Sequence, residues 1–99
     1  MSEQSGIRVV HNPAELRYEL RIDGELAGEI RYVKRPGTTV LVQTDIEPSR
    51  EGQGLASQLV RGALDDLRVR GERVVVICPY VGAYMRRHPE YDDLVDPPE

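Results

Sequence analysis

Two glycines, Gly52 and Gly54, stand at the junction between two different sequence patterns. The run that ends at Pro48 is rich in β-branched residues, as strands are, and a long amphipathic run follows the glycines. A strand that turns through glycines into a helix leaves several backbone N–H groups without an intrahelical acceptor. These donors and the positive end of the helix dipole attract anions. The junction therefore predicts a binding site for a phosphate-bearing ligand.

Two other phosphate-binding motifs fit this junction less well. A dinucleotide fingerprint needs a third glycine, where this chain has Ser57, and an acidic residue on the next strand, where residues 74–77 carry none. A kinase-type P-loop needs Gly-Lys-Ser/Thr, which does not follow the glycines. A tight strand-to-helix connection without a ligand is the remaining alternative.

Composition places the chain among small soluble proteins. Its 99 residues are 39% hydrophobic and 30% charged, which suits one domain over 1–99, with disordered tails at 1–6 and 96–99. The formal net charge of −4 gives no global basic footprint for nucleic acid. The start is polar, and no apolar run approaches the roughly 20 residues that cross a bilayer. We expect a cytoplasmic monomer or weak dimer with neither nucleic acid nor membrane as partner.

The first half of the chain predicts an antiparallel meander. Strands are expected at 7–11, 16–22, 25–34 and 38–46, separated by an Asn-Pro break and by Asp-Gly and Pro-Gly turns. Alternation predicts that Arg17, Glu19 and Arg21 share a solvated face. The side chains expected on the buried face of the second and third strands are Leu16, Tyr18, Leu20, Ile22, Leu26, Gly28, Ile30 and Tyr32.

The second half changes to helical periodicity. Apolar residues recur at helical spacing over 52–70, with Gly62 in the middle, where it could allow close packing on the sheet. Residues 74–77 are apolar without alternation and predict a strand over 73–77 that is buried on both faces. Pro79 can open a shorter helix over 79–87. The expected fold is α/β: a mixed, mostly antiparallel sheet with one right-handed parallel βαβ crossover and two helices.

This order of elements resembles the GNAT superfamily of acetyl-CoA-dependent N-acetyltransferases. The signature turn of that family, Gln/Arg-x-x-Gly-x-Gly/Ala, aligns with residues 51–56: Gly54 and Ala56 match, whereas Glu51 replaces Gln or Arg. The likeness spans residues 15–95. The chain is similar to a short single-domain branch of the superfamily, whose members have mostly unassigned substrates. Typical members place one or two helices between the first two strands. Their absence here implies an acceptor side that is open or completed by a partner.

The resemblance implies a place for each part of the cofactor. Acetyl-CoA would be the co-substrate, with its pantetheine arm added like a strand to residues 44–47 and its pyrophosphate held by backbone N–H groups of the glycine turn. No cluster of residues has metal-ligand spacing, so no metal is expected. The implied cofactor-binding residues are Thr44, Asp45, Ile46, Glu47, Gly52, Gln53, Gly54, Leu55, Ala56 and Ser57.

Three side chains are candidate catalytic residues. Cys78, the single cysteine, is either a small buried hydrophobic residue or a thiolate that accepts an acyl group. Tyr84 stands where the family often carries a tyrosine near the cofactor thioether; it would return a proton to the departing thiolate or simply pack against the sheet, and Tyr80 is a weaker rival. His88 is a candidate base, as is His11, although a lone histidine is commonly a capping or surface residue.

The resemblance implies direct transfer of acetyl from a coenzyme A thioester to a primary amine of unknown identity. Glu29 and Asp45 could bind that amine on the open sheet face, or belong to a solvated polar face. The alternative function is a non-catalytic acyl-CoA-binding, sensor or interaction module, which the open acceptor side favours. A purely structural adaptor would bind no coenzyme A.

Overall fold

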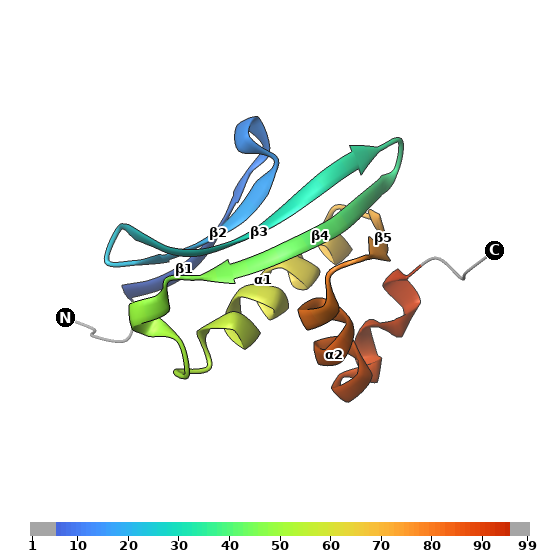
Figure 1. Cartoon of the computed structure of the whole chain (residues 1–99). Coiled ribbons are helices and arrows are strands. Elements are labelled where there is room, and N and C mark those ends of the chain that lie inside the picture. Colours follow the sequence, from blue (N-terminus) through green and yellow to red (C-terminus); the bar gives the residue numbers. More distant parts are fainter. Residues whose placement is uncertain (1–5, 96–99) are drawn as a thin grey trace.

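The computed structural model describes residues 6–95 as a single five-stranded sheet with helices on one side (Figure 1). The tails expected at 1–6 and 96–99 lie outside the described residues except for Gly6, whose carbonyl accepts a hydrogen bond of 2.9 Å from the N–H of Asp23. The elements in chain order are β1 Ile7–Asn12, β2 Arg17–Ile22, β3 Glu25–Arg35, β4 Thr38–Ile46, α1 Leu55–Val69, β5 Arg73–Val76 and α2 Pro79–Arg87, with short 3-10 helices at Pro13–Glu15, Pro48–Arg50 and Pro89–Leu94.

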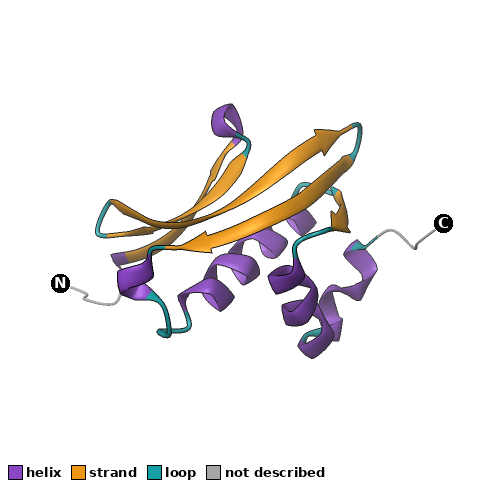
Figure 2. Ribbon diagram, viewed as in Figure 1, coloured by secondary structure: helices purple, strands orange, loops and turns teal. Residues whose placement is uncertain are grey.

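The strand order is β1-β2-β3-β4-β5, which confirms the expected fold class. The first four strands pair antiparallel as a meander, and β4 pairs parallel with β5 across the α1 crossover. Both α1 and α2 lie on the same side of the sheet (Figure 2). A single 3-10 turn, Pro13–Glu15, joins β1 to β2, and the opposite face of the sheet carries no α-helix within residues 6–95. We call this opposite face the open face.

The helix α1 begins at Leu55, three residues later than the sequence predicted. Gly52 and Gly54 adopt φ values of 83° and 72°, in the left-handed region that an α-helix cannot contain. The chain therefore makes its turn entirely before the first helical residue. The far end closes as expected, with Gly71 at φ 72°.

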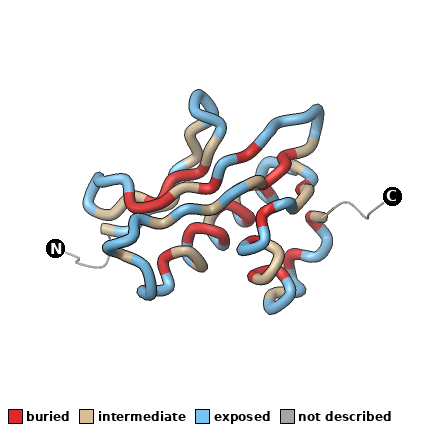
Figure 3. Tube along the Cα trace, in the orientation of Figure 1, coloured by how far each residue is buried: buried red, intermediate tan, exposed pale blue. Residues whose placement is uncertain are grey.

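The core lies between α1 and the sheet (Figure 3). One side of α1 buries six residues against the strands, as its spacing predicted: Leu55, Leu59, Val60, Ala63, Leu64 and Leu67. The prediction of burial was wrong for Leu16, which precedes β2 and is 48% exposed, and for Leu26 on β3, which is exposed while Ala27 is buried in its place. The pairing with β2 shifts by one residue here, with Leu20 opposite Gly28 and its neighbour opposite Leu26. This bulge reverses the alternation at the start of β3.

The apolar sequence of β5 predicted burial on both faces, but only one face of the strand is buried. Val74 is fully buried, Val76 is half-buried and Ile77, just after the strand, is 62% exposed. β5 is the last strand in the sheet, and the helices cover only one of its faces, so one side of an apolar run faces solvent.

Glu19 was expected on a solvated face and is instead 2% exposed on the open face. Its carboxylate accepts hydrogen bonds from Asn12 (2.9 Å), Arg17 (2.8 Å) and Arg21 (2.9 and 3.0 Å), whose side chains shield it from water. Burial alone would raise the pKa of Glu19, but these three donors lower it to about 2. The open face is thus organised around a buried carboxylate.

Gly62 allows α1 to lie close to β1, as proposed from the sequence. A Cβ at this position would stand 2.7 Å from Cγ2 of Val9. We expect Gly62→Ala to destabilise the protein by about 1 kcal/mol in chemical denaturation, because overpacking outweighs the helix propensity gained from alanine. Gly82→Ala on α2 is the matched control: its Cβ would meet no atom closer than 3.8 Å, so we expect it to stabilise by about 0.5 kcal/mol.

A double variant tests the cause of this effect. Val9→Ala removes Cγ1 and Cγ2, two of the three Val9 atoms that the new Cβ would meet, and leaves the Val9 Cβ at 2.8 Å, so it relieves part of the overlap. We expect Gly62→Ala to cost less in the Val9→Ala background than in the wild type. Equal costs in the two backgrounds would contradict the packing explanation.

Candidate functional site

A cavity of about 350 Å³ lies where the end of β4, the glycine loop and the first turns of α1 and α2 meet. Its walls mix backbone, apolar side chains and two opposite charges. The lining residues are Thr44, Ile46, Arg50, Glu51, Gly52, Gly54, Leu55, Ala56 and Tyr80. Six of them were predicted to bind the cofactor, and Arg50, Glu51 and Tyr80 are additional.

The glycine loop leaves backbone donors at the start of α1. Gly54 is the N-cap and has no side chain to cap the helix, and the N–H of Gln58 closes the first turn onto its carbonyl at 3.4 Å. The N–H groups of Leu55, Ala56 and Ser57 therefore have no acceptor within the helix. Two of these residues line the cavity, so the positive end of the α1 dipole borders it.

The edge of β4 beside the cavity is unpaired. The parallel ladder joins Thr38–Leu41 to Arg73–Val76 and no further. The carbonyl of Leu41 then accepts from the N–H groups of both Ile77 (2.9 Å) and Cys78 (3.0 Å), and the chain turns away into α2. In the described part of the chain no strand pairs with residues 42–46 on that side. The backbone groups that point to this edge, which come from alternate residues because the others bond to β3, are free to bind an extended ligand.

Cys78 lies directly behind one wall of the cavity. Its side chain is 2% exposed and its Sγ is 3.2 Å from Oγ1 of Thr44, which lines the cavity. Cys78 also serves as the N-cap residue of α2, which begins at Pro79 as predicted. The structure thus brings the thiol within one side chain of the cavity.

Tyr80 closes another part of the wall. It is 41% exposed in the first turn of α2, and its hydroxyl lies 3.2 Å from Oγ of Ser57 in the first turn of α1. The sequence named Tyr80 only as a rival of Tyr84. The position of Tyr80 directly after the Cys-Pro start of α2 could have identified it as a cavity residue, since the first turn of α2 faces the end of β4.

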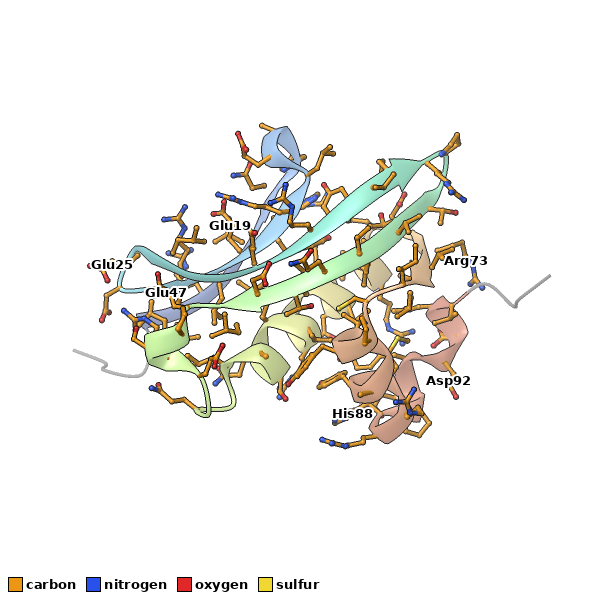
Figure 4. The ribbon with its side chains drawn as sticks, viewed as in Figure 1. Glu19, Glu25, Glu47, Arg73, His88 and Asp92 are labelled. Carbon is orange, nitrogen blue, oxygen red and sulfur yellow. The ribbon has the colours of Figure 1, made fainter. Side chains whose placement is uncertain are left out.

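Tyr84 and His88 do not line the cavity. Tyr84 is 6% exposed and belongs to the core, where burial raises the pKa of its phenol. Its ring stacks on that of His88 with centroids 4.0 Å apart. His88 lies at the C-terminal end of α2 (Figure 4), and its Nδ1 is 3.4 Å from Oε2 of Glu90.

The other predicted residues of β4 divide between the two faces of the sheet. Thr44 and Ile46 line the cavity, whereas Asp45 and Glu47 line a shallow hollow of about 410 Å³ together with Glu29. Glu29 stands opposite Asp45 in the β3–β4 register. The side chains of Asp45 and Glu47 therefore lie away from the cavity, and the N–H of Glu47 donates to the carbonyl of Ala27 on β3 at 2.8 Å.

The side chain of Arg50, next to the glycine loop, forms a weak ion pair on the surface. The guanidinium of Arg50 lies 3.3 Å from a carboxylate oxygen of Glu25, which is 76% exposed. Such pairs contribute about 0–1 kcal/mol, so Arg50 can exchange this partner for a ligand at little cost. Glu51 has no cation within 4 Å among the described residues.

His11 belongs to a second polar cluster, away from this cavity. Its Nε2 lies 2.7 Å from the hydroxyl of Tyr32, and its ring stacks on Tyr18, whose hydroxyl donates to Asp66 at 2.6 Å. Burial, followed by the charge of Arg70, lowers the pKa of His11. These contacts fasten the C-terminal half of α1 to β1–β3.

Within residues 6–95 no group of three or more histidine, cysteine or acidic side chains could hold a metal ion. None of the helices described there has the length and apolar character needed to cross a membrane.

Comparisons with known proteins bear on the family and the fold. The family model described as GCN5-related N-acetyl-transferase matches residues 17–94. No curated protein matches the sequence. The structure is similar to that of a GCN5-like protein from Staphylococcus aureus, solved by NMR, with a TM-score of 0.69, 15% identity, and coverage of 96% of this chain and 93% of that one.

A second solved structure is similar over less of its length. It is a ribosomal-protein-alanine N-acetyltransferase from Brucella melitensis biovar Abortus 2308, with a TM-score of 0.52 and 19% identity. The match covers 84% of this chain and 63% of that one. At these identities the two likenesses concern the fold.

Proposed function

We propose that this chain, which belongs to the GCN5-related N-acetyltransferase family, transfers an acetyl group from acetyl-CoA to a primary amine. Members of this family generally use acetyl-CoA as the acetyl donor. One observation carries the proposal for this chain: the glycine loop and the unpaired edge of β4 border the same cavity. Neither feature alone would distinguish a coenzyme A thioester from any other anion or extended ligand.

The residues present fit the parts of such a ligand. The N–H groups at the start of α1 suit a pyrophosphate, with Arg50 as a nearby cation. The free N–H and C=O groups of residues 42–46 suit the two amides of a pantetheine arm, which can pair with them as a neighbouring strand would. Glu51 opposes the phosphates by its charge, so we expect modest affinity.

The chemistry proposed is attack of a neutral amine on the thioester carbonyl: the C–N bond forms, the C–S bond breaks, and the proton lost by the amine ends on the departing coenzyme A thiolate. A backbone N–H on the free edge of β4 would stabilise the developing oxyanion, and the walls of the cavity would orient the thioester. Cys78, Tyr84 and His88 remain candidate catalytic residues. The proximity of Cys78 to the cavity supports a role for the thiol, whereas Tyr84 and His88 do not line the cavity.

Titration of acetyl-CoA into isotope-labelled protein tests the binding site. We expect the largest backbone amide shift changes at residues 52–57 and 42–46, because these N–H groups would gain acceptors. Amides of the second polar cluster around His11 should change little and serve as an internal control. Changes centred on that cluster, or none at all, would contradict the assignment of the cavity.

Turnover separates the enzyme from a binding module. We expect release of free coenzyme A thiol from acetyl-CoA when the correct amine is present in a panel of small amines and peptides. Cys78→Ala should abolish this release if the acetyl group passes through the thiol and should spare it if transfer is direct. The placement of Tyr84 and His88 outside the cavity favours the second candidate, a non-catalytic acyl-CoA-binding module, which would bind acetyl-CoA without any release.

A further inference from the structure

Thr44 forms the part of the cavity wall that lies next to Cys78. Thr44 stands opposite Ile30 in the β3–β4 register, so its side chain faces the helices. It lies three residues beyond Leu41, where β4 and β5 separate. An arm that ran along the free edge of β4 from the glycine loop would therefore bring its thioester end to Thr44.

The space behind Thr44 is filled. Oγ1 of Thr44 is 3.2 Å from Sγ of Cys78, which is 2% exposed. Leu41 and Ile30, its neighbours in the sheet, are both fully buried. Thr44 lines the cavity and Cys78 and Leu41 do not, so the side chain of Thr44 lies between the cavity and Cys78. Close-packed groups of this kind do not yield to an added methylene without cost.

We propose that Thr44 determines acyl-chain specificity by closing the inner end of the cavity over Cys78. A two-carbon acyl group ends beside Thr44, whereas each further methylene of a longer chain meets the Thr44–Cys78 contact. This inference rests on the function proposed above and adds the class of donor, a short-chain acyl thioester. The bulk of the threonine side chain, rather than its hydrogen-bonding ability, sets the limit.

Calorimetric binding of coenzyme A, acetyl-CoA, butyryl-CoA and hexanoyl-CoA tests the proposal without requiring turnover. For the wild type we expect butyryl-CoA to bind at least about tenfold more weakly than acetyl-CoA. Thr44→Ala should bring the two affinities within about threefold, because it removes the γ-methyl and hydroxyl groups that face the chain. Thr44→Val keeps the bulk and should keep the wild-type ratio.

Coenzyme A itself is the reference, because it has no acyl group: its affinity for each variant measures any change in binding of the arm, and each acyl-CoA affinity is divided by it. If Thr44→Ala does not fold, Cys78→Ala removes the other half of the contact and should relax the ratio in the same direction. An unchanged ratio in both alanine variants, a wild type that binds all chain lengths equally, or loss of selectivity in Thr44→Val would overturn the inference while coenzyme A still binds. Failure of the wild type to bind coenzyme A would instead overturn the proposed function.

Discussion

Replacing Gly54 by valine is expected to lower the affinity for acetyl-CoA by at least about thirtyfold, or about 2 kcal/mol, in calorimetric titration. Gly54 lines the cavity and caps α1, and a Cβ there would meet no protein atom within 4 Å. The methyl groups of valine would project into space that the phosphates need in order to reach the N–H groups of the first turn. The backbone at φ 72° adds a folding cost of about 1–2 kcal/mol.

Gly71→Val is the matched control for this variant. Gly71 has the same φ of 72°, and its Cβ would likewise meet nothing within 4 Å, but it lies at the opposite end of α1. We expect the two variants to lose similar stability and only Gly54→Val to lose binding. Equal affinity in the two variants would show that the glycine loop does not hold the ligand.

The largest effect on stability outside the apolar core is expected at Glu19. Glu19→Gln should lower the free energy of unfolding by about 2 kcal/mol at pH 7, measured by urea denaturation. The amide keeps the shape of the side chain but leaves Arg17 and Arg21 without their shared anion. Glu25→Gln is the control: Glu25 is 76% exposed with one weak ion pair, so its replacement should change stability by less than about 0.5 kcal/mol.

The contribution of Glu19 should depend on pH in a defined direction. Its pKa falls from an ordinary value of 4.5 to about 2 in the folded protein, so the unfolded chain binds this proton more readily. The stability that Glu19 supplies is therefore complete above about pH 4.5 and is lost as the pH falls towards 2. The difference between wild type and Glu19→Gln should shrink through that window. A constant difference from pH 7 to pH 2 would contradict an ionised, hydrogen-bonded Glu19.

Local sequence predicted the structure correctly where a single residue determines the backbone conformation. Asp23 and Gly24 adopt φ values of 52° and 86°, the left-handed pair that an Asp-Gly hairpin turn requires. Pro79 opens α2 at the expected position because a proline at the first helical residue gives up no helix hydrogen bond. The spacing of apolar residues likewise predicted which side of α1 is buried.

The sequence predicted burial incorrectly where the surroundings of a residue depend on other strands. Leu26 and Ala27 exchange faces because the pairing with β2 contains a bulge, which is a property of two strands together. Ile77 is exposed although its run is apolar, because β5 is the edge strand. Glu19 is buried because residues from β1 and β2 converge on it, a meeting that no periodicity describes.

The same division holds for the candidate site. By itself the sequence determined the glycine loop, because left-handed backbone needs glycine, and the strand-helix-strand order that leaves donors at the start of α1. Only the tertiary structure decided which side chains meet there: Thr44 against Cys78, and Tyr80 in place of Tyr84. Those meetings depend on where β4 and β5 separate and on how the first turn of α2 faces the end of β4. They are fixed by long-range packing, to which each residue contributes only a part.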